Sequence, residues 1–396
     1  MKKELELYVH IPFCVKKCAY CDFLSGPAQK KEMDSYVDAL VREIGLRGIE
    51  YRGYDVSTVF VGGGTPSILK GVDTARIFHA IRENFSVKRD AEVTIEVNPG
   101  TVTEEKAEIW KKCGITRLSI GLQSVRNDDL KLLGRIHTYE QFLRTWELVR
   151  KTGFQNVNID LISAIPGQTA ESWTETLRTV AELCPEHISA YSLIVEEGTP
   201  FYEQYGTCRS ADRMEGGDRM RGKSMEYPPL PDEDTERMIY KATEQVLAEY
   251  GYHRYEVSNY ALPGYECRHN IGYWERKEYL GLGLGASSLV CEKRFHNPTD
   301  MGRYLAKCGT PDSDEEVEFL STEEQMEEFM FLGLRKTEGV SPEDFRRAFG
   351  KDIMDIYKVQ IRKLEAQGLL ENAGGRIRLT ERGTDISNYV FGEFIF

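Results

Sequence analysis

The sequence contains no long hydrophobic run, and this absence excludes the simplest class of membrane protein. No window holds eighteen consecutive apolar residues, so no segment is apolar enough to span a bilayer as a helix. The N-terminus reads Met1-Lys2-Lys3-Glu4 and lacks the apolar core and cleavage site of a secretory signal. We therefore expect a cytoplasmic protein without a transmembrane segment. This expectation does not exclude peripheral contact with membrane proteins.

Positive charge is also scarce. The chain has 51 Lys and Arg against 64 Asp and Glu, which gives a formal net charge of −13. A protein that binds duplex nucleic acid needs a basic surface that neutralises phosphates. The acidic balance therefore argues against nucleic acid as a partner. With 396 residues, 41% of all residues hydrophobic and 29% charged, the chain is typical of a globular protein with one large domain and a smaller one.

The cysteines do not form an even set, because the chain has nine of them. An odd number in a cytoplasmic protein argues against a framework of disulfides. Three of the nine crowd together near the start, in Cys14-Val-Lys-Lys-Cys18-Ala-Tyr-Cys21. The other six have no mutual spacing that suits a metal. A metal site or reactive thiols would explain the crowding.

Strand-like and helix-like segments alternate from the N-terminus to about residue 198. The strands are short runs rich in Val, Ile, Tyr or Thr, bounded by Gly, Pro or Asn, at 5–11, 58–61, 93–97, 117–122, 157–165 and 187–195. Amphipathic helices are expected between them, at 33–47, 73–84, 104–113, 139–152 and 171–183. Six β–α units in series predict a parallel sheet with helices outside. The periodicity leaves open whether this is a partial barrel or an open doubly wound sheet.

The alternation stops after residue 198. Residues 209–223 are charged and rich in Gly and Met, and Pro228-Pro229-Leu230-Pro231 is a rigid stop, so we interpret 199–232 as an exposed insertion or lid. A helix is then expected at 232–250, an extended segment at 252–261, and a Gly-rich turn with a hairpin at 281–298. The expected domains are 1–198, 199–319 and 320–396.

The last of these domains reads as helices followed by a short hairpin. Helices are predicted at 322–334, 342–349 and 352–367, then two strands around Gly374-Gly375 and a final helix. This order resembles a winged-helix α+β domain. Residues 321–396 carry 11 Lys and Arg against 14 Asp and Glu, so the basic surface that DNA requires is missing. We expect this domain to pack against the rest or to dock a protein.

The cysteine triplet directly follows the first predicted strand, in the loop at its carboxyl end. Parallel α/β proteins place their ligands there. Three thiolates at this spacing can ligate three irons of a [4Fe–4S] cluster and leave the fourth iron open. Zinc is the alternative, with His10 or Asp22 as a fourth ligand. The spacing favours the cluster over zinc.

The pattern Cys-x3-Cys-x2-Cys, with an aromatic residue before the third Cys, resembles the signature of radical S-adenosylmethionine (SAM) enzymes. The resemblance implies a partial (β/α)6 barrel in which the amino and carboxylate groups of SAM chelate the open iron. Polar or Gly residues also follow successive predicted strands, where one pocket could gather them, although any single one could be a satisfied core residue. The candidates for the SAM site are Tyr8, Tyr20, Gly63, Gly64, Thr65, Glu96, Gln123, Arg135 and Asp160.

Nearly the whole chain resembles the oxygen-independent coproporphyrinogen III oxidases, and most closely their HemW branch of heme chaperones. The segments that carry the resemblance are 8–13, 62–67, 120–124, 160–169 and 329–335. Two departures separate the chain from the decarboxylating branch. That branch has a further Cys where Phe23 stands here, and a long N-terminal arm where this chain has seven residues before Tyr8. Both departures argue against oxidative decarboxylation.

The segment Arg268-His269-Asn270-Ile-Gly-Tyr273-Trp274 matches the His-Asn-x-x-Tyr-Trp pattern of heme binding in the HemW branch. The resemblance implies that His269 ligates heme iron, that Tyr273 and Trp274 stack on the porphyrin, and that Asn270 belongs to the same site. The simpler alternative is a pair of core aromatics beside a hydrogen-bonded histidine. The repeated glycines at 281, 283 and 285 lack the strand–helix context of a dinucleotide loop.

The sequence therefore predicts a radical SAM protein that holds a [4Fe–4S] cluster, SAM and heme, and that passes heme to acceptor proteins. One alternative is a coproporphyrinogen III dehydrogenase of porphyrin biosynthesis. Another is a winged-helix regulator that senses heme or the state of the cluster, although the acidic C-terminal domain counts against it.

Overall fold

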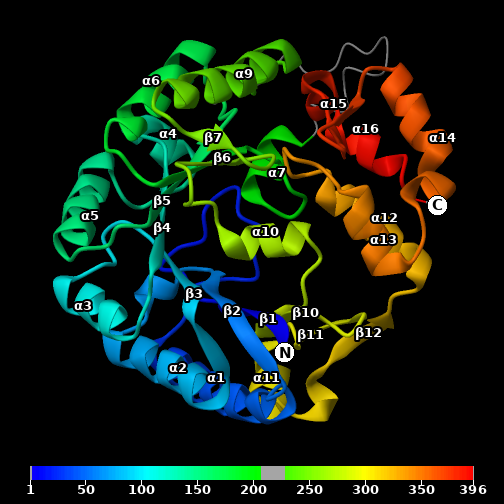
Figure 1. Ribbon diagram of the computed structural model, residues 1–396. Coiled ribbons are helices and arrows are strands. Elements are labelled where there is room, and N and C mark those ends of the chain that lie inside the picture. The colour runs from blue at the N-terminus through cyan, green and yellow to red at the C-terminus, as the bar shows by residue number, and fades with distance from the viewer. Residues whose placement is uncertain (1, 207–227, 396) are drawn as a thin grey trace.

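The computed structural model describes residues 2–206 and 228–395, and a single twelve-stranded sheet forms its centre (Figure 1). The strand order is β12-β11-β10-β9-β1-β2-β3-β4-β5-β6-β8-β7. The strands β1 to β6 are neighbours in sequence order and pair in parallel. Their bounds are β1 Lys3–Ile11, β2 Tyr54–Gly63, β3 Ser86–Val97, β4 Arg117–Gln123, β5 Val157–Ser163 and β6 His187–Ser192.

The main helices between these strands cover the outer, convex face of the sheet (Figure 1). They are α1 Lys30–Glu50, α2 Gly71–Asn84, α3 Glu104–Lys112, α5 Tyr139–Lys151 and α6 Ala170–Ala181, with the short α4 Asn127–Leu132 between β4 and α5. A Thr side chain accepts a backbone N–H at the start of α3, α5 and α6, which satisfies a donor that the helix itself leaves unpaired. The partial (β/α)6 barrel is therefore confirmed over the doubly wound sheet, which would carry helices on both faces.

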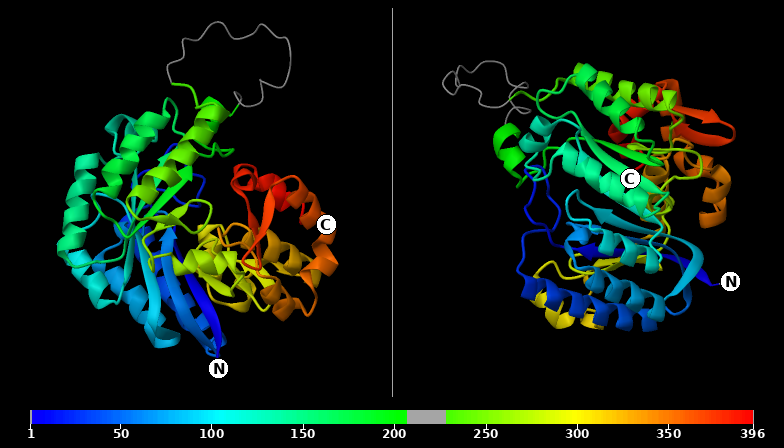
Figure 2. Two further views of the ribbon diagram at one scale, coloured as in Figure 1. Left: turned by 45° about the horizontal axis from the view of Figure 1, so that its top comes forward. Right: turned by 90° about the vertical axis from the view of Figure 1, so that its left-hand side faces the viewer.

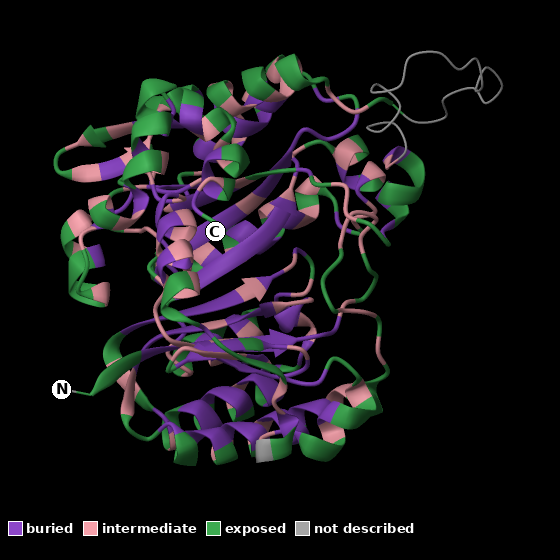
Figure 3. Cartoon of the chain, turned by 90° about the vertical axis from the view of Figure 1, so that its right-hand side faces the viewer, coloured by how far each residue is buried: buried purple, intermediate pink, exposed green. Residues whose placement is uncertain are grey.

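Strand β1 alternates between the two faces of the sheet, as a strand must. One set of its side chains is buried between the sheet and the outer helices: Leu5, Leu7, Val9 and Ile11. The intervening Glu6, Tyr8 and His10 face the inside of the barrel, where Tyr8 and His10 line a cavity. The buried strands and the green outer faces of the helices show the same division (Figure 3).

Further strands extend the sheet at both edges. Strand β9 (Tyr279–Leu282) joins β1 in parallel, and the hairpin of β10 (Ser287–Val290) and β11 (Lys293–His296) continues to β12 (Glu315–Phe319). Strands β8 (Asn259–Ala261) and β7 (His253–Arg254) lie beyond β6. The hairpin predicted within 281–298 is confirmed.

Strand β9 was not predicted, because Gly281 within it and Gly283 and Gly285 just after it indicate a turn. Gly281 is required for a different reason. A Cβ there would lie 2.3 Å from the carbonyl oxygen of Ser287, so only glycine lets the two backbones approach. The turn signal was therefore a signal of close packing between β9 and β10.

The described part of 199–319 contains three α-helices besides α10 (Arg268–Trp274). The helices are α7 Pro200–Tyr205, α9 Glu233–Glu249 and α11 Met301–Lys307. Helix α9 packs on α6, where the Trp173 indole donates to Thr243 Oγ1 at 2.8 Å. The charged segment 209–223, interpreted as the centre of an insertion or lid, lies outside the described residues.

The short helix α10 (Arg268–Trp274) lies on the concave side of the sheet (Figure 1). Its first N–H groups have no side-chain cap from their own segment. The Glu92 carboxylate of β3 replaces that cap, because it accepts the N–H of Arg268 at 3.2 Å and of His269 at 3.3 Å. The Cys267 thiol also donates to Glu92 at 3.5 Å. The start of α10 is thereby fixed to the barrel.

The C-terminal domain has its own core beside the open side of the barrel (Figure 2). Its elements are α12 Thr322–Gly333, α13 Pro342–Phe349, α14 Ile353–Ala366, β13 Leu370–Ala373, β14 Arg376–Leu379, α15 Glu381–Asp385 and α16 Ser387–Gly392. Ser341 caps α13 by accepting the Asp344 N–H. The winged-helix-like order is confirmed. Within the described residues, no helix is long and apolar enough to cross a membrane.

Two glycines of this domain separate backbone strain from steric clash. Gly339 and Gly350 both have positive φ, +70° and +67°, but a Cβ on Gly339 would lie 2.1 Å from the Ile377 carbonyl oxygen, whereas Gly350 has open space. We expect Gly350→Ala to cost about 1 kcal/mol of unfolding free energy, from strain alone. Gly339→Ala should cost about 3 kcal/mol or more. Calorimetric unfolding measures the loss of stability in each variant. Equal losses for Gly339→Ala and Gly350→Ala would contradict the steric clash at Gly339.

Candidate cofactor sites

The cysteine triplet lies at the mouth of a cavity of about 490 Å³ at the carboxyl ends of the barrel strands. Almost all of the candidates for the SAM site line it. They are Tyr20, Gly63, Gly64, Thr65, Glu96, Gln123, Arg135 and Asp160, together with Cys14, Cys18 and Cys21. Tyr8 is the exception, because it lines a second cavity. We call the first one the cluster cavity.

A chain of hydrogen bonds joins two of the cysteines. Arg135 Nη1 donates to Cys18 Sγ at 3.5 Å, and its Nη2 donates to Asn98 Oδ1 at 2.6 Å. The Asn98 amide donates to Thr65 Oγ1 at 2.8 Å, which leaves the Thr65 hydroxyl proton to donate to Cys14 Sγ at 3.4 Å. Hydrogen bonds donated to the ligand sulfurs are one of the features by which a protein tunes an iron–sulfur cluster. Sequence reasoning did not include Asn98 among the site residues, although Asn98 directly follows β3, the strand that carries Glu96.

The donor set fits a cluster better than a zinc ion. All eight cysteines in the described residues are free thiols. No three His, Cys, Asp or Glu side chains in that part of the chain are arranged around one ion. A cubane takes its thiolates on different irons, so its ligands need no common centre. His10, the suggested zinc ligand, has both ring nitrogens occupied, by the Tyr8 hydroxyl at 3.1 Å and the Leu24 carbonyl oxygen at 2.9 Å.

Two half-buried carboxyl groups line the cluster cavity. Glu96 Oε2 accepts the Gly63 N–H at 3.1 Å, and Asp160 accepts from Ser119 Oγ at 3.0 Å and Asn158 Nδ2 at 2.7 Å. Burial, together with the negative charge of Asp160, raises the pKa of Glu96 to about 8. Burial also raises the pKa of Asp160. A carboxyl with a pKa of about 8, such as that of Glu96, is partly neutral near pH 7 and can exchange hydrogen bonds with the hydroxyl or amino groups of a ligand.

Gln123 reaches the same cavity through a strained backbone. Its φ is +74°, in the region that L-residues rarely adopt, and the register between β4 and β5 shifts between Gly121 and Gln123. A bulge of this kind redirects a side chain at the end of a strand. Strain is retained at sites where position matters more than stability, which supports a ligand-binding role for Gln123.

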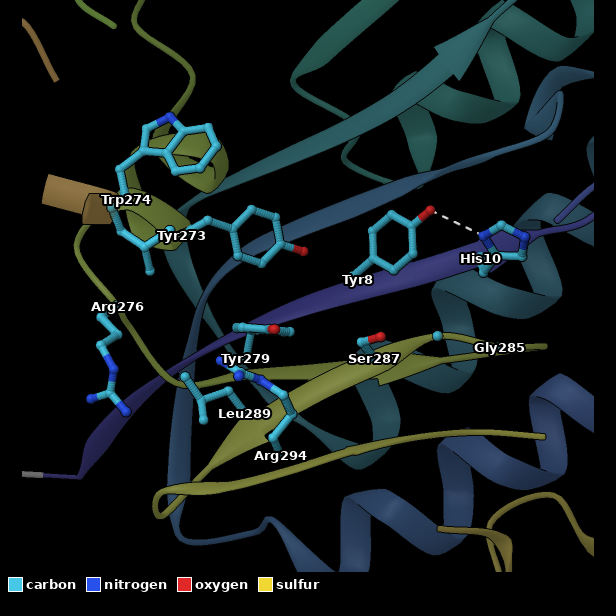
Figure 4. A pocket seen from close by; sticks show the side chains of 12 residues that line it. Tyr8, His10, Tyr273, Trp274, Arg276, Tyr279, Gly285, Ser287, Leu289 and Arg294 are labelled. Atoms are coloured by element: carbon cyan, nitrogen blue, oxygen red, sulfur yellow. Dashed lines mark hydrogen bonds between the residues drawn. The ribbon is translucent and has the colours of Figure 1, made fainter. Parts of the chain in front are cut away.

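A second cavity, of about 450 Å³, lies between β1, the β10–β11 hairpin, α10 and α12 (Figure 4). We call it the aromatic cavity, after Tyr8, Tyr273, Trp274 and Tyr279. The other residues that line it are His10, Arg276, Gly285, Ala286, Ser287, Leu289, Arg294 and Leu332.

The aromatic cavity adjoins the cluster cavity. His10 lines the aromatic cavity and Gly63 the cluster cavity. The two are in close contact, because a Cβ on Gly63 would lie 2.4 Å from the His10 ring. Gly63 also has a φ of +107°, so no other residue would fit there easily. The two cavities are therefore neighbours that share a wall.

His269 lies behind the aromatic cavity. Its side chain is almost fully buried, and its two ring nitrogens face Thr58 Oγ1 at 2.7 Å and the Tyr273 hydroxyl at 3.0 Å. The Phe60 ring stacks on the imidazole, and Glu6 Oε2 lies 3.7 Å from Nδ1. Burial lowers the pKa of His269 to about 3 and raises that of Glu6 to about 8. A bond from His269 Nε2 to iron would require its hydrogen bond to Tyr273 to break.

The four residues of the His-Asn-x-x-Tyr-Trp pattern therefore do not all line one cavity. Tyr273 and Trp274 line the aromatic cavity, whereas His269 and Asn270 line neither cavity. Arg276, Tyr279 and Arg294 were not predicted from the sequence. The alternation of β9 and β11 could have marked Tyr279 and Arg294, had β9 been recognised as a strand.

Comparisons with known proteins agree along the whole chain. The model of the radical SAM superfamily matches residues 8–180, and that of the HemN C-terminal domain matches 320–386. Proteins named heme chaperone HemW from Lactococcus lactis and Bacillus subtilis are 37% and 35% identical to this chain. The first match covers 100% of this chain and 98% of that protein, the second 98% of each. The solved coproporphyrinogen III oxidase (HemN) of Escherichia coli, a radical SAM enzyme, superposes with a TM-score of 0.81 at 24% identity, over 100% of this chain and 90% of that one.

The raised pKa of Glu96 predicts how stability depends on pH. The folded chain keeps a proton on this carboxyl between its ordinary pKa of 4.5 and about 8, and the unfolded chain does not, so unfolding free energy falls as pH rises through this window. Glu96→Gln removes that slope, which is at most about 1.4 kcal/mol per pH unit. Denaturant unfolding from pH 5 to 8 measures it. The exposed Glu105→Gln is the control, and parallel curves for Glu96→Gln and wild type would refute the assignment.

The hydrogen-bonded chain through Asn98 predicts a change in redox behaviour. Protein reconstituted without oxygen should bind about four irons, and replacing Cys14, Cys18 and Cys21 by Ser should abolish this. Asn98→Ala should keep the iron but lower the reduction potential, because Thr65 and Arg135 lose the group that aims their donors at sulfur. A redox titration with Asn372→Ala as control measures the effect. Iron retained by the triple Ser variant, or an unchanged potential in Asn98→Ala, would contradict this site.

Proposed function

This chain belongs to the HemW family of the radical SAM superfamily, and we propose on that basis that it is a heme chaperone. In this proposal it binds heme together with a SAM-ligated [4Fe–4S] cluster, and transfers the heme to acceptor proteins. We place this activity in the cytoplasm, where reducing conditions keep thiols free. The observation that carries the proposal is the aromatic cavity, which gathers Tyr273 and Trp274 of the heme-binding pattern beside Tyr8 and Tyr279.

The cluster cavity would hold the cluster and SAM. Cys14, Cys18 and Cys21 would each ligate one iron, and SAM would chelate the fourth. When bound, the cluster supplies an electron that can cleave SAM. The chain's own contribution is to donate hydrogen bonds to the cysteine sulfurs from Thr65 and Arg135, and to present carboxyl groups and backbone beside them.

The aromatic cavity would hold the heme. Its volume of about 450 Å³ is within the range of pockets that bind cofactors. Aromatic side chains offer a flat ring large apolar surfaces, and their hydroxyl and indole groups can meet its polar edge. Tyr273, which lines this cavity, also bonds to His269, so the histidine of the pattern can act on the site through Tyr273. This arrangement supports reversible binding of a planar ligand.

The placement of the aromatic residues outside the cluster cavity favours a chaperone over a decarboxylating enzyme. Hydrogen abstraction requires the substrate carbon and the radical at reacting distance, and small misplacements are costly in rate. The aromatic side chains that would hold a tetrapyrrole line a different cavity from the three cysteines. Phe23, at the position where the decarboxylating branch has a Cys, is 61% exposed and lines the cluster cavity. Both observations suit a protein that carries the ring without reacting with it.

Heme titration tests the proposal. We expect binding of about one heme per chain with a Soret band, and no release of CO₂ from coproporphyrinogen III in the presence of SAM and a reductant. Trp274→Ala should weaken binding through lost stacking, and His269→Ala should shift the Soret band through Tyr273, while the iron and sulfide of the cluster stay unchanged.

The exposed His79→Ala serves as the control for this titration. Robust decarboxylation by the wild type would favour the enzyme. Heme binding that is indifferent to both Trp274→Ala and His269→Ala would place heme elsewhere.

A further inference from the structure

Two arginines close one end of the aromatic cavity. Arg276 follows α10 and Arg294 lies on β11, and both lie near Tyr279 and Leu289, at the end away from His10 (Figure 4). Neither belongs to the His-Asn-x-x-Tyr-Trp pattern. A site that is otherwise aromatic thus has a cationic end.

A single buried carboxylate holds this arginine pair. Glu328 of α12 accepts from Arg276 Nε at 2.6 Å and from Arg294 Nη2 at 2.5 Å. Its side chain is only 8% exposed, so it is a fixed part of the cavity end. The C-terminal domain therefore supplies the group that positions both guanidinium groups. Glu328 balances one of the two positive charges, and exposed carboxylates beside the pair balance the rest, Glu292 at Arg276 and Glu318 opposite Arg294.

The second counter-ion of Arg276 is exposed and replaceable. Arg276 also pairs with Glu292, whose side chain is 46% exposed. Exposed ion pairs contribute little, because water and salt screen them. A carboxylate on a ligand could therefore replace Glu292 at small cost. At the cavity wall it would gain a charge-assisted hydrogen bond with the fork geometry that suits guanidinium groups.

The backbone of Arg276 is strained in a way that supports a ligand-binding role. Its φ is +57°, in the left-handed region that residues other than glycine rarely adopt. This conformation occurs just after α10, where glycine is the usual residue. It leaves the guanidinium only 10% exposed and at the cavity wall. Strain of this kind is kept where the position of a side chain is functional.

We propose that Arg276 and Arg294 bind the carboxylate groups of the tetrapyrrole, whose ring lies among Tyr8, Tyr273 and Tyr279. The inference rests on the proposed function, in which this cavity holds heme. The two propionates of heme lie on one edge of the ring, and the paired arginines offer them one cationic end. The cavity therefore selects tetrapyrroles with free carboxylates and fixes which edge enters first.

Heme and heme dimethyl ester, which lacks the two charges, are the probes that test this inference. Titrations use the full chain with its cluster reconstituted. Wild type should bind heme about ten-fold or more tightly than the ester, because the uncharged ester cannot form charge-assisted hydrogen bonds with the arginines. Arg276→Gln and Arg294→Gln should each weaken heme binding about ten-fold and leave ester binding unchanged.

A third variant acts in the opposite direction. Glu328→Gln keeps the shape of the cavity end but removes the competing negative charge, so it should tighten the binding of heme and leave that of the ester unchanged. Arg346→Gln, in an exposed ion pair of the C-terminal domain, is the matched control. A merely structural role for Glu328 predicts weaker binding of both ligands.

The outcomes separate this inference from the proposed function. Equal affinities of the wild type for heme and ester would overturn the arginine site and leave a heme chaperone standing. Equal weakening of both ligands by the arginine variants would also overturn it, because the arginines would then only shape the cavity. A wild type that binds neither ligand would refute the proposed function, and the arginine site with it.

Discussion

Both cavities depend on the register of one strand. β1 pairs in parallel with β2 on one side and β9 on the other, and these two ladders fix which of its side chains face inward. A shift by one residue would turn Leu7 and Val9 into the barrel and bury Tyr8 and His10 against the outer helices. The same strand ends at the loop that carries the cysteines. The cluster cavity and the aromatic cavity are therefore positioned by one element.

The C-terminal domain completes the aromatic cavity from the other side. Leu332 lines it and Glu328 holds the arginine pair, both from α12. Arg335 lies over the Trp274 ring at 4.5 Å, and Lys336 pairs with Glu275 just after α10. These contacts give the winged-helix-like domain a role in shaping the cavity. Its excess of acidic residues is compatible with that role.

The cluster half of the molecule was predictable because its chemistry is local. The triplet lies within eight residues, and Glu96, Gln123 and Asp160 belong to strands whose patterns were clear. Asn98 was missed although it follows the same strand as Glu96, because its role depends on partners from two other segments.

The aromatic cavity was harder to predict, because it depends on contacts between distant segments. The alternation of β1 predicts that Tyr8 faces inward, but not that it lines the aromatic cavity. The burial of His269 comes from Thr58 and Phe60, which lie on another strand. Gly281 concealed strand β9, because a glycine among further glycines indicates a turn. Arg276 and Arg294 have meaning only beside Glu328, which comes from another domain. No short pattern in the sequence could have brought these three residues together.

The central claim is that one chain has two separate sites, one for the cluster and one for heme. Heme titration of the variant with Ser at positions 14, 18 and 21, beside the reconstituted wild type, tests it most directly. The account predicts that the variant loses its iron and sulfide but binds heme with the same stoichiometry and nearly the same affinity. Loss of heme binding together with the cluster, in a variant that is otherwise folded, would contradict it.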